Sequence, residues 1–268
     1  MERPSNSAIS VVICSIDARK FERVSENYRM LFAGRDIEII GIHDARSLAE
    51  GYTRGIAQSR GARVILSHDD IEILTADFAP RIDRHLGDFD LIGIAGTTRL
   101  VAGKWAAAGD PYVFALITSP FEDRAGYATM MLGGGPLLVP GIQALDGVFL
   151  ALKREVAMAI PFDGAVFDGF HLYDLDFSFR AHRAGFKLAV CRDIVLIHES
   201  TGRYDAAWDE QKRRFEAKHR AVLPESGTYK VGARASFSAA TRDDILRRCD
   251  PARLVDIAAE IGRANASL

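Results

Sequence analysis

The stretch Val64-Ile65-Leu66-Ser67-His68-Asp69-Asp70-Ile71-Glu72-Ile73 decides how the fold is interpreted. Its β-branched and aliphatic start predicts a buried strand of the kind found in parallel sheets. Open α/β sheets bind ligands where their strands end, and two adjacent carboxylates there are costly to bury without a cation or hydrogen-bond donors. The stretch therefore predicts a divalent-metal site for a phosphorylated ligand. The alternative is a plain strand followed by an Asx turn, in which Asp69 or Asp70 caps the next segment.

Strand-like and helix-like patterns alternate along most of the chain. Apolar runs predict strands at 8–14, 37–42, 64–66, 91–96, 145–152, 187–191 and 194–197. Segments with one apolar face predict helices at 20–32, 47–60, 78–86 and 173–185. Strands and helices that alternate at short intervals are typical of an α/β fold, with a parallel sheet and right-handed crossovers.

Two segments depart from this alternation. Residues 97–140 contain many glycines, and Trp105 stands isolated among polar residues. This pattern predicts either an irregular insertion or β excursion, part of which could move over a ligand as a lid, or a plain connecting loop. The last segment is charged and mostly helical in pattern, with a loop marked by Gly227 and Gly232. We expect one domain over residues 1–204 and a helical extension over 205–268 packed on it.

Composition narrows the classes of protein that the chain can belong to. With 268 residues and a net charge of -2, it suits one large domain or two small ones and gives no sign of a nucleic-acid surface. Its three cysteines have neither zinc-type spacing nor the pattern of a disulfide framework. Residues 1–7 lack a signal-peptide core, and no apolar stretch is long enough to span a bilayer. These features favour a cytoplasmic protein. The first strand is followed by neither the dinucleotide nor the P-loop fingerprint.

Three further polar residues stand where strands or helices begin or end. Asp174 opens a predicted helix, where it is either a simple cap or a general base for a hydroxyl group. His198 follows the apolar run 194–197 and is either a packed side chain or a metal ligand. One carboxylate, one imidazole and phosphate oxygens suit Mn²⁺ better than Mg²⁺. Asp44 ends the second strand and either receives a base N–H or begins a turn. Asp176 is expected to orient Arg180 or Arg183.

The order and spacing of five motifs resemble those of a known family. The motifs are Val12-Ile13-Cys14-Ser15, Ile65-Leu66-Ser67-His68-Asp69-Asp70, Asp146-Gly147-Val148-Phe149-Leu150, the segment 167–185, and Ile197-His198. The chain resembles family 2-type glycosyltransferases of the GT-A fold over residues 8–200, and is most similar to the short bacterial glycosyltransferase-like branch. The resemblance implies a Rossmann-like, mainly parallel central sheet flanked by helices, with a helical C-terminal extension.

The resemblance also implies roles for individual residues. By position, Asp70 is the metal-side carboxylate, His198 the late metal-binding imidazole, and Asp174 the catalytic base. The donor-binding positions are Ser15 and Asp44 for nucleobase and ribose, Asp69 for ribose or sugar, and Asp146 with Gly147 for the sugar and acceptor pocket. The chain departs from the family pattern twice, because His68 replaces the usual first acid and Tyr173 replaces a glutamate.

The expected activity follows from these roles. The resemblance implies an inverting, metal-dependent transfer of a sugar from a nucleotide-sugar to a saccharide or other hydroxyl acceptor, with Mn²⁺ or Mg²⁺ as the cofactor. A UDP-sugar is the favoured donor because Asp44 suits a pyrimidine imide N–H. The extension, with Trp208, Phe215 and Phe237, covers the acceptor, forms a homo-oligomer interface, or only supports the domain. Two alternatives remain: a sugar-phosphate nucleotidyltransferase, and a non-catalytic nucleotide-sugar binding protein.

Overall fold

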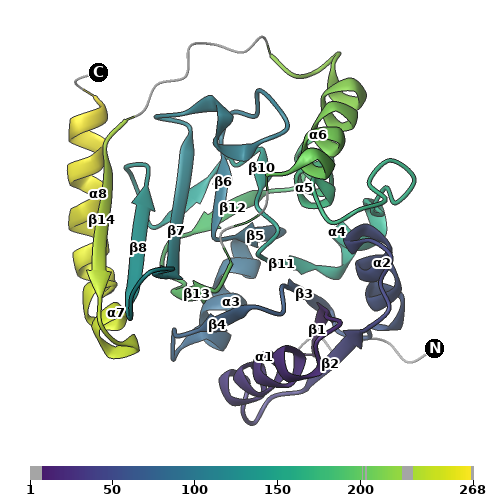
Figure 1. The fold of residues 1–268 in the computed structure, drawn as a ribbon, viewed down its shortest axis with the longest axis horizontal. Helices are drawn as coiled ribbons and strands as arrows, with labels where there is room; N and C mark the ends of the chain where they lie inside the picture. Colours follow the sequence, from purple (N-terminus) through teal and green to yellow (C-terminus); the bar gives the residue numbers. More distant parts are fainter. Residues whose placement is uncertain (1–7, 201, 203, 225–231, 267–268) are drawn as a thin grey trace.

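A mixed sheet forms the centre of the molecule in the computed structural model, which describes residues 8–200, 202, 204–224 and 232–266 (Figure 1). Its strands run in the order β2 (Ile37–Ile42), β1 (Ile9–Cys14), β3 (Arg63–Ser67), β11 (Phe149–Lys153), β5 (Leu91–Gly93), β12 (Leu188–Cys191) and β9 (Leu138–Pro140). The predicted fold class is confirmed. The parallel pairs are β2–β1, β1–β3 and β5–β12, whereas β11 and β9 run antiparallel to their neighbours, so the sheet is mixed rather than mainly parallel.

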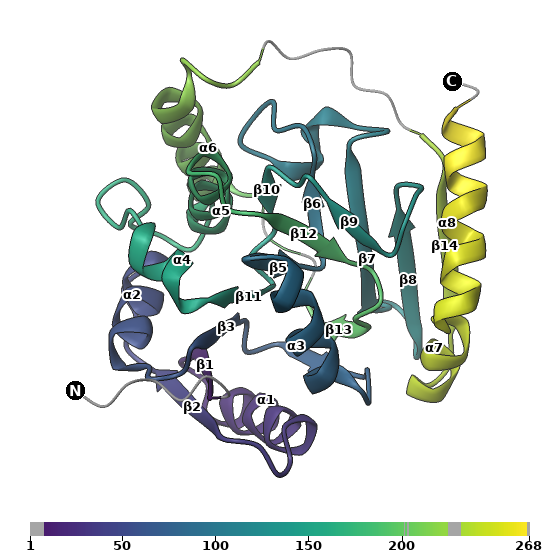
Figure 2. The same ribbon diagram turned by 180° about the vertical axis from the view of Figure 1, so that it is seen from behind.

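Helices cover both faces of this sheet because its strands are apolar on both sides. Ile65 of β3 belongs to the core under α1 (Ala18–Leu31) and α3 (Phe78–Asp88). Its neighbours Val64 and Leu66 belong to the opposite core, under α2 (Leu48–Gln58), α4 (Arg154–Ala159), α5 (Tyr173–Arg183) and α6 (Ala206–His219). Figure 2 shows α3 on the near face of the sheet, with α2, α4, α5 and α6 gathered along one side. Asp17 and Ser47 cap α1 and α2 through their side-chain oxygens.

A second sheet lies against the first and explains the irregular segment of the sequence. Its strands are β10 (Ala144–Leu145), β6 (Ala95–Thr97), β7 (Val113–Pro120), β13 (Leu196–His198) and β4 (Ile71–Ile73), and β8 (Tyr127–Leu132) pairs with β7. Residues 97–140 are therefore a β excursion, interrupted by the short 3-10 helix η1 (Trp105–Ala108). One strand was not expected: β14 (Arg234–Ala239) pairs with β8, within a segment that we predicted to be mostly helical.

The C-terminal helices cover this second sheet. Leu116 of β7 and Met131 of β8 pack against residues of α7 (Arg242–Arg248) and α8 (Pro251–Asn265), which stand at the edge of the molecule in yellow-green and yellow in Figure 1. The adjacent residues Ile117 and Met130 line a cavity instead, because side chains alternate along a strand. Gly227 lies outside the described residues. Within the described part, none of the helices has the length and apolar character needed to cross a membrane.

Arg192 joins the two sheets. It follows β12 and is completely buried, and its guanidinium donates hydrogen bonds to the backbone carbonyl oxygens of Leu132 and of residues 133–136, which connect β8 to β9. Burial lowers the pKa of Arg192 to about 10, so the side chain remains a cation at neutral pH. A single side chain therefore satisfies a run of carbonyl groups that the glycine-rich connection leaves without strand partners.

Candidate active site

The turn between β3 and β4 meets the end of β13, and three polar side chains converge there. β13 pairs antiparallel with β4, so that His198 lies opposite Ile71. This register brings His198 Nε2 to 3.3 Å from Asp70 Oδ1, and His68 Nδ1 lies 3.8 Å from the same oxygen. We call His68, Asp70 and His198 the cavity cluster; their potential ligand atoms all lie within 4.8 Å of one another.

The cavity cluster fits a divalent cation both in spacing and in charge. Two ligands about 2.1 Å from an ion stand roughly 3–4 Å apart, and the distances from Asp70 Oδ1 to His198 and His68, 3.3 and 3.8 Å, fall in this range. Burial alone would raise the pKa of Asp70, but its hydrogen bond with His198 and the charge of that ring hold it well below the usual range. Burial and the neighbouring His198 lower the pKa of His68, which favours the neutral ring that a metal requires. Asp70 is thus ionised and His68 neutral at neutral pH.

The predicted nucleotide-binding residues divide into two groups. Ser15, at the end of β1, donates a hydrogen bond of 2.6 Å from its hydroxyl to Asp69 Oδ2, so these two residues meet beside the cavity cluster. Asp44 lies elsewhere, on the surface after β2. Its side chain is 75% exposed, and Arg54 of α2 contacts it at 2.6 Å and lowers its pKa. His43, the residue before Asp44, contacts the first group, because its Nδ1 is hydrogen-bonded to the carbonyl oxygen of Ser15.

Asp174 occupies the first turn of α5, directly against the segment Asp146-Gly147. A Cβ atom on Gly147 would lie 2.8 Å from Asp174 Oδ2 and 2.5 Å from the hydroxyl of Tyr173, so only glycine fits here. Burial and the charge of Asp146 raise the pKa of Asp174 to about 7. The N-cap of α5 is Leu172, so Asp174 is not the capping residue. A carboxyl group with this pKa suits a general base at neutral pH.

Asp146 is held by groups that the sequence did not associate with it. Its Oδ2 accepts a hydrogen bond of 2.8 Å from the indole N–H of Trp105, and its Oδ1 accepts one from the backbone of Val148. Trp105 belongs to η1, and the same loop contacts α6, because the N–H of Gly103 donates to Glu216. The isolation of Trp105 among polar residues was the sequence signal for this contact, but its partner could not be read from the sequence.

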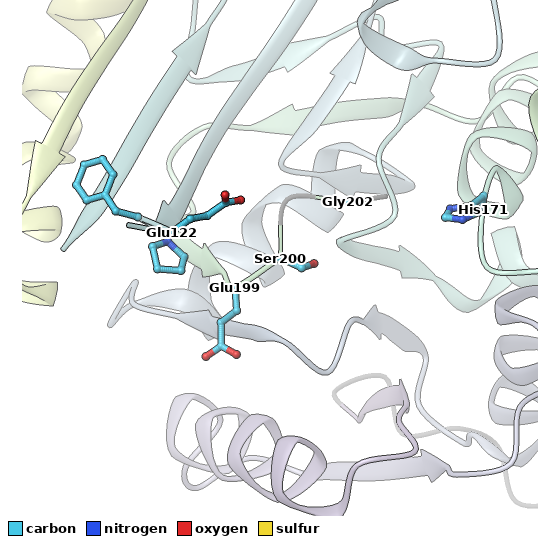
Figure 3. Close-up of a pocket in the computed structure, with 7 residues that line it drawn as sticks. Glu122, His171, Glu199, Ser200 and Gly202 are labelled. Atoms are coloured by element: carbon cyan, nitrogen blue, oxygen red, sulfur yellow. The ribbon is translucent and has the colours of Figure 1, made fainter. Parts of the chain in front are cut away.

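One cavity of about 490 Å³ connects these groups. Its lining includes four predicted site residues and several aromatic rings: Asp146, Gly147, Asp174, His198, Trp105, Phe170, Tyr204 and Trp208. A second hollow of about 550 Å³ opens beside it and shares His171, Ser200 and Gly202 with the first. Figure 3 shows Ser200 and Gly202 lying between Glu122 on one side and His171 on the other. His198 and Asp174 therefore line the same cavity.

Tyr173 and His68 are the residues whose part in this site the sequence reasoning missed. Both were noted only as departures from a family pattern. The structure brings the Tyr173 hydroxyl to 3.1 Å from His68 Nε2, and so links the first turn of α5 to the cavity cluster. A contact between residues 105 positions apart leaves no local signal in the sequence.

Comparisons with known proteins identify the family of the chain and a structure of similar fold. Residues 10–219 match a family model described as a glycosyltransferase-like family. The fold is similar to that of the mannosyltransferase PcManGT from Pyrobaculum calidifontis, whose structure was solved in complex with GDP-Man and Mn²⁺. The TM-score is 0.51 at 11% sequence identity, over 99% of this chain and 77% of that chain, so this likeness concerns the fold. Among curated proteins, none matches the sequence.

Proposed function

This chain belongs to the glycosyltransferase-like family, and from that premise we propose that it transfers a sugar from a nucleotide-sugar to an acceptor hydroxyl with inversion at the anomeric carbon. The observation that carries the proposal is the cavity shared by Asp174 and His198. Its lining includes the proposed base, Asp174, and both histidines of the cluster suited to a cation. An inverting transfer needs these two functions on opposite sides of the reacting carbon.

The residues divide the reaction between them. Asp174, with a pKa of about 7, accepts the proton of the acceptor hydroxyl as that oxygen attacks the anomeric carbon. The bond from this carbon to the nucleoside diphosphate breaks, and negative charge develops on the diphosphate. Asp70 and His198 would hold a divalent ion, Mn²⁺ or Mg²⁺, which when bound supplies charge neutralisation for that leaving group. Asp146 and Gly147 shape the pocket between the two.

The donor and the acceptor are assigned by class. We assign the nucleotide side to Ser15 and Asp69, which are hydrogen-bonded to each other, and the base-recognising role to the separate, exposed Asp44, which supports a UDP-sugar as the proposed donor. The mannosyltransferase of similar fold binds GDP-Man, so a guanosine donor belongs in the same test. On the acceptor side, Trp105 and Trp208 line the same cavity, and aromatic rings pack well against the apolar face of a sugar, which favours a saccharide acceptor.

The decisive experiment measures nucleoside diphosphate release. We expect UDP-glucose, UDP-galactose, UDP-GlcNAc or GDP-mannose to be hydrolysed or transferred with Mn²⁺ and not with EDTA. Asp174→Asn should reduce the rate by at least ~10²-fold, because it removes general-base catalysis. The matched control is Asp88→Asn, an exposed carboxylate at the end of α3, which should retain the full rate.

Two outcomes would overturn the proposal in favour of the alternatives. Pyrophosphate release from a nucleoside triphosphate and a sugar phosphate would identify a nucleotidyltransferase. Binding of a nucleotide-sugar without turnover, equally in the unaltered protein and in Asp174→Asn, would identify a non-catalytic binding protein.

A further inference from the structure

The hydroxyl of Tyr173 contacts Nε2 of His68, the ring nitrogen that is not the one facing Asp70. This hydroxyl lies 3.4 Å from the carbonyl oxygen of Gly147 and 3.1 Å from His68 Nε2. A hydroxyl has one hydrogen, and a carbonyl oxygen can only accept. Tyr173 therefore donates to Gly147 and has only a lone pair left for His68. On this donor pattern we assign the ring proton of His68 to Nε2, which places the lone pair of the neutral ring on Nδ1.

The lone pair on Nδ1 faces the cavity cluster. Nδ1 is the ring nitrogen of His68 that lies 3.8 Å from Asp70 Oδ1, and His198 Nε2 approaches the same oxygen at 3.3 Å. The two imidazole rings stand with their centroids 5.7 Å apart, so both are beside the carboxylate. The backbone of His68 is fixed as well, because its N–H donates to the carbonyl oxygen of Val148 at 3.2 Å.

In this arrangement His68 can bind a metal through one ring nitrogen while Tyr173 holds the other ring nitrogen. A histidine that binds a metal almost always donates its other ring N–H to a fixed acceptor, which sets the tautomer and the ring orientation. Burial raises the pKa of the Tyr173 hydroxyl well above its usual value, so the acceptor stays neutral and keeps its own hydrogen. Tyr173 is 3% exposed and therefore has little freedom to turn away.

We propose that His68 is a metal ligand through Nδ1 and that Tyr173 is the positioning residue that aims it, which gives the ion two imidazoles and one carboxylate. The proposal rests on the proposed function only in that it uses the same ion. Imidazole ligands favour Mn²⁺, Co²⁺ or Zn²⁺ over Mg²⁺ and Ca²⁺, which prefer oxygen. Because Tyr173 and Asp174 are adjacent in α5, one helical turn positions a metal ligand and presents the proposed base.

The test measures metal binding to the protein without nucleotide or sugar. Mn²⁺ binding is followed by electron paramagnetic resonance and Mg²⁺ binding by titration calorimetry. We expect Mn²⁺ to bind at least ~10-fold more tightly than Mg²⁺. Tyr173→Phe should weaken Mn²⁺ binding by roughly 10–100-fold, the usual effect of removing a group behind a ligand. His68→Asp should reduce the preference for Mn²⁺, and the control His182→Asn, at the far end of α5, should change neither affinity.

Pulsed resonance of bound Mn²⁺ gives a second, direct measurement. Two coordinated imidazole nitrogens are expected in the unaltered protein and one in His68→Gln, which keeps the proposal testable even if Tyr173→Phe does not fold. Unchanged Mn²⁺ affinity and nitrogen count in His68→Gln would overturn the proposal. Metal-dependent release of nucleoside diphosphate by that same variant would leave the proposed function standing. If the unaltered protein binds no divalent ion, both the His68 proposal and the metal part of the proposed function fail.

Discussion

Two clusters of histidine and aspartate occur in the described part of the molecule, and their surroundings differ. The cavity cluster of His68, Asp70 and His198 lies beside an open cavity. The second, which we call the buried cluster, consists of His85 of α3 with Cys191 and Asp193 at the end of β12. His85 Nε2 approaches both carboxylate oxygens of Asp193, at 2.9 and 3.1 Å. Distance alone would allow a metal ion in either cluster.

Charge separates the two clusters. Arg81 of α3 lies 3.3 Å from Asp193 Oδ2 and also donates to its backbone carbonyl, so a permanent cation already neutralises that carboxylate. Burial, and then the charge of Asp193, raises the pKa of the Cys191 thiol well above its usual value, which disfavours the thiolate that a metal needs. The ion-pair partners of Asp70 among the described residues are two histidines. The cavity cluster is therefore the better candidate for a metal site, because among the described residues no arginine or lysine pairs with its carboxylate.

Asp70→Asn should produce the largest effect and sharpen this comparison most. It removes the carboxylate of the cavity cluster, and with it the several kcal/mol that a bound ion contributes to the leaving group. We expect the rate of nucleoside diphosphate release to fall by ~10³-fold. The melting temperature, measured by circular dichroism, should stay within a few degrees of the unaltered value. A variant that keeps its Mn²⁺-dependent rate would show that the two clusters do not differ in function.

Metal-induced stabilisation should follow the cavity cluster alone. Mn²⁺ at ~100 times its dissociation constant adds about 2.7 kcal/mol of stability, or roughly 5 °C in melting temperature. We expect this increase in the unaltered protein and in His85→Asn, even if the latter starts from a lower temperature. It should be lost in His198→Asn. An increase that disappears with His85→Asn instead would place the ion in the buried cluster.

Asp193→Asn should have the opposite profile to Asp70→Asn. It leaves His85 without its charged partner and takes one of two carboxylates from Arg81, which still pairs with Asp77. In this mostly buried setting we expect a cost of about 2 kcal/mol of unfolding free energy in urea denaturation. The rate of transfer is measured under conditions in which the variant is fully folded. It should change by less than about threefold, which is smaller than the tenfold change produced by about 1.4 kcal/mol of activation free energy. Loss of transfer without loss of stability would contradict the structural role assigned to the buried cluster.

The pH profile tests the base side, with the smallest expected change. Because the carboxylate form of Asp174 is the active one and its pKa is about 7, the rate should fall as pH decreases through 7, about tenfold for each unit below it. Asp146→Asn removes one of the causes that raise this pKa, so the acidic limb should move to lower pH. A limb that stays in place would mean that Asp146 has no electrostatic effect on Asp174.

The sequence predicts local structure well in this chain, and contacts between distant segments poorly. The apolar run at Val64 to Leu66 identifies β3 because strands buried on both faces have few other compositions. The meeting of Asp70 with His198 was expected only from a family resemblance, since it depends on the register of β13 against β4. The Tyr173–His68 contact and β14, whose sequence Arg-Ala-Ser-Phe-Ser-Ala is only weakly apolar, leave no local signal. The boundary at residue 204 stays a prediction.

Pairing of β14 with β8 has a consequence for synthesis on the ribosome. Residues 127–132 emerge about a hundred positions before residues 234–239, which complete their hydrogen-bonded ladder. At ordinary elongation rates β8 waits roughly 5–20 s with an unpaired edge. During that interval the unpaired edge of β8 can form hydrogen bonds with strands of other nascent chains that are being made on the same mRNA. We expect slower translation of this interval to lower the yield of native protein, and any chain that stops before Arg234 to aggregate.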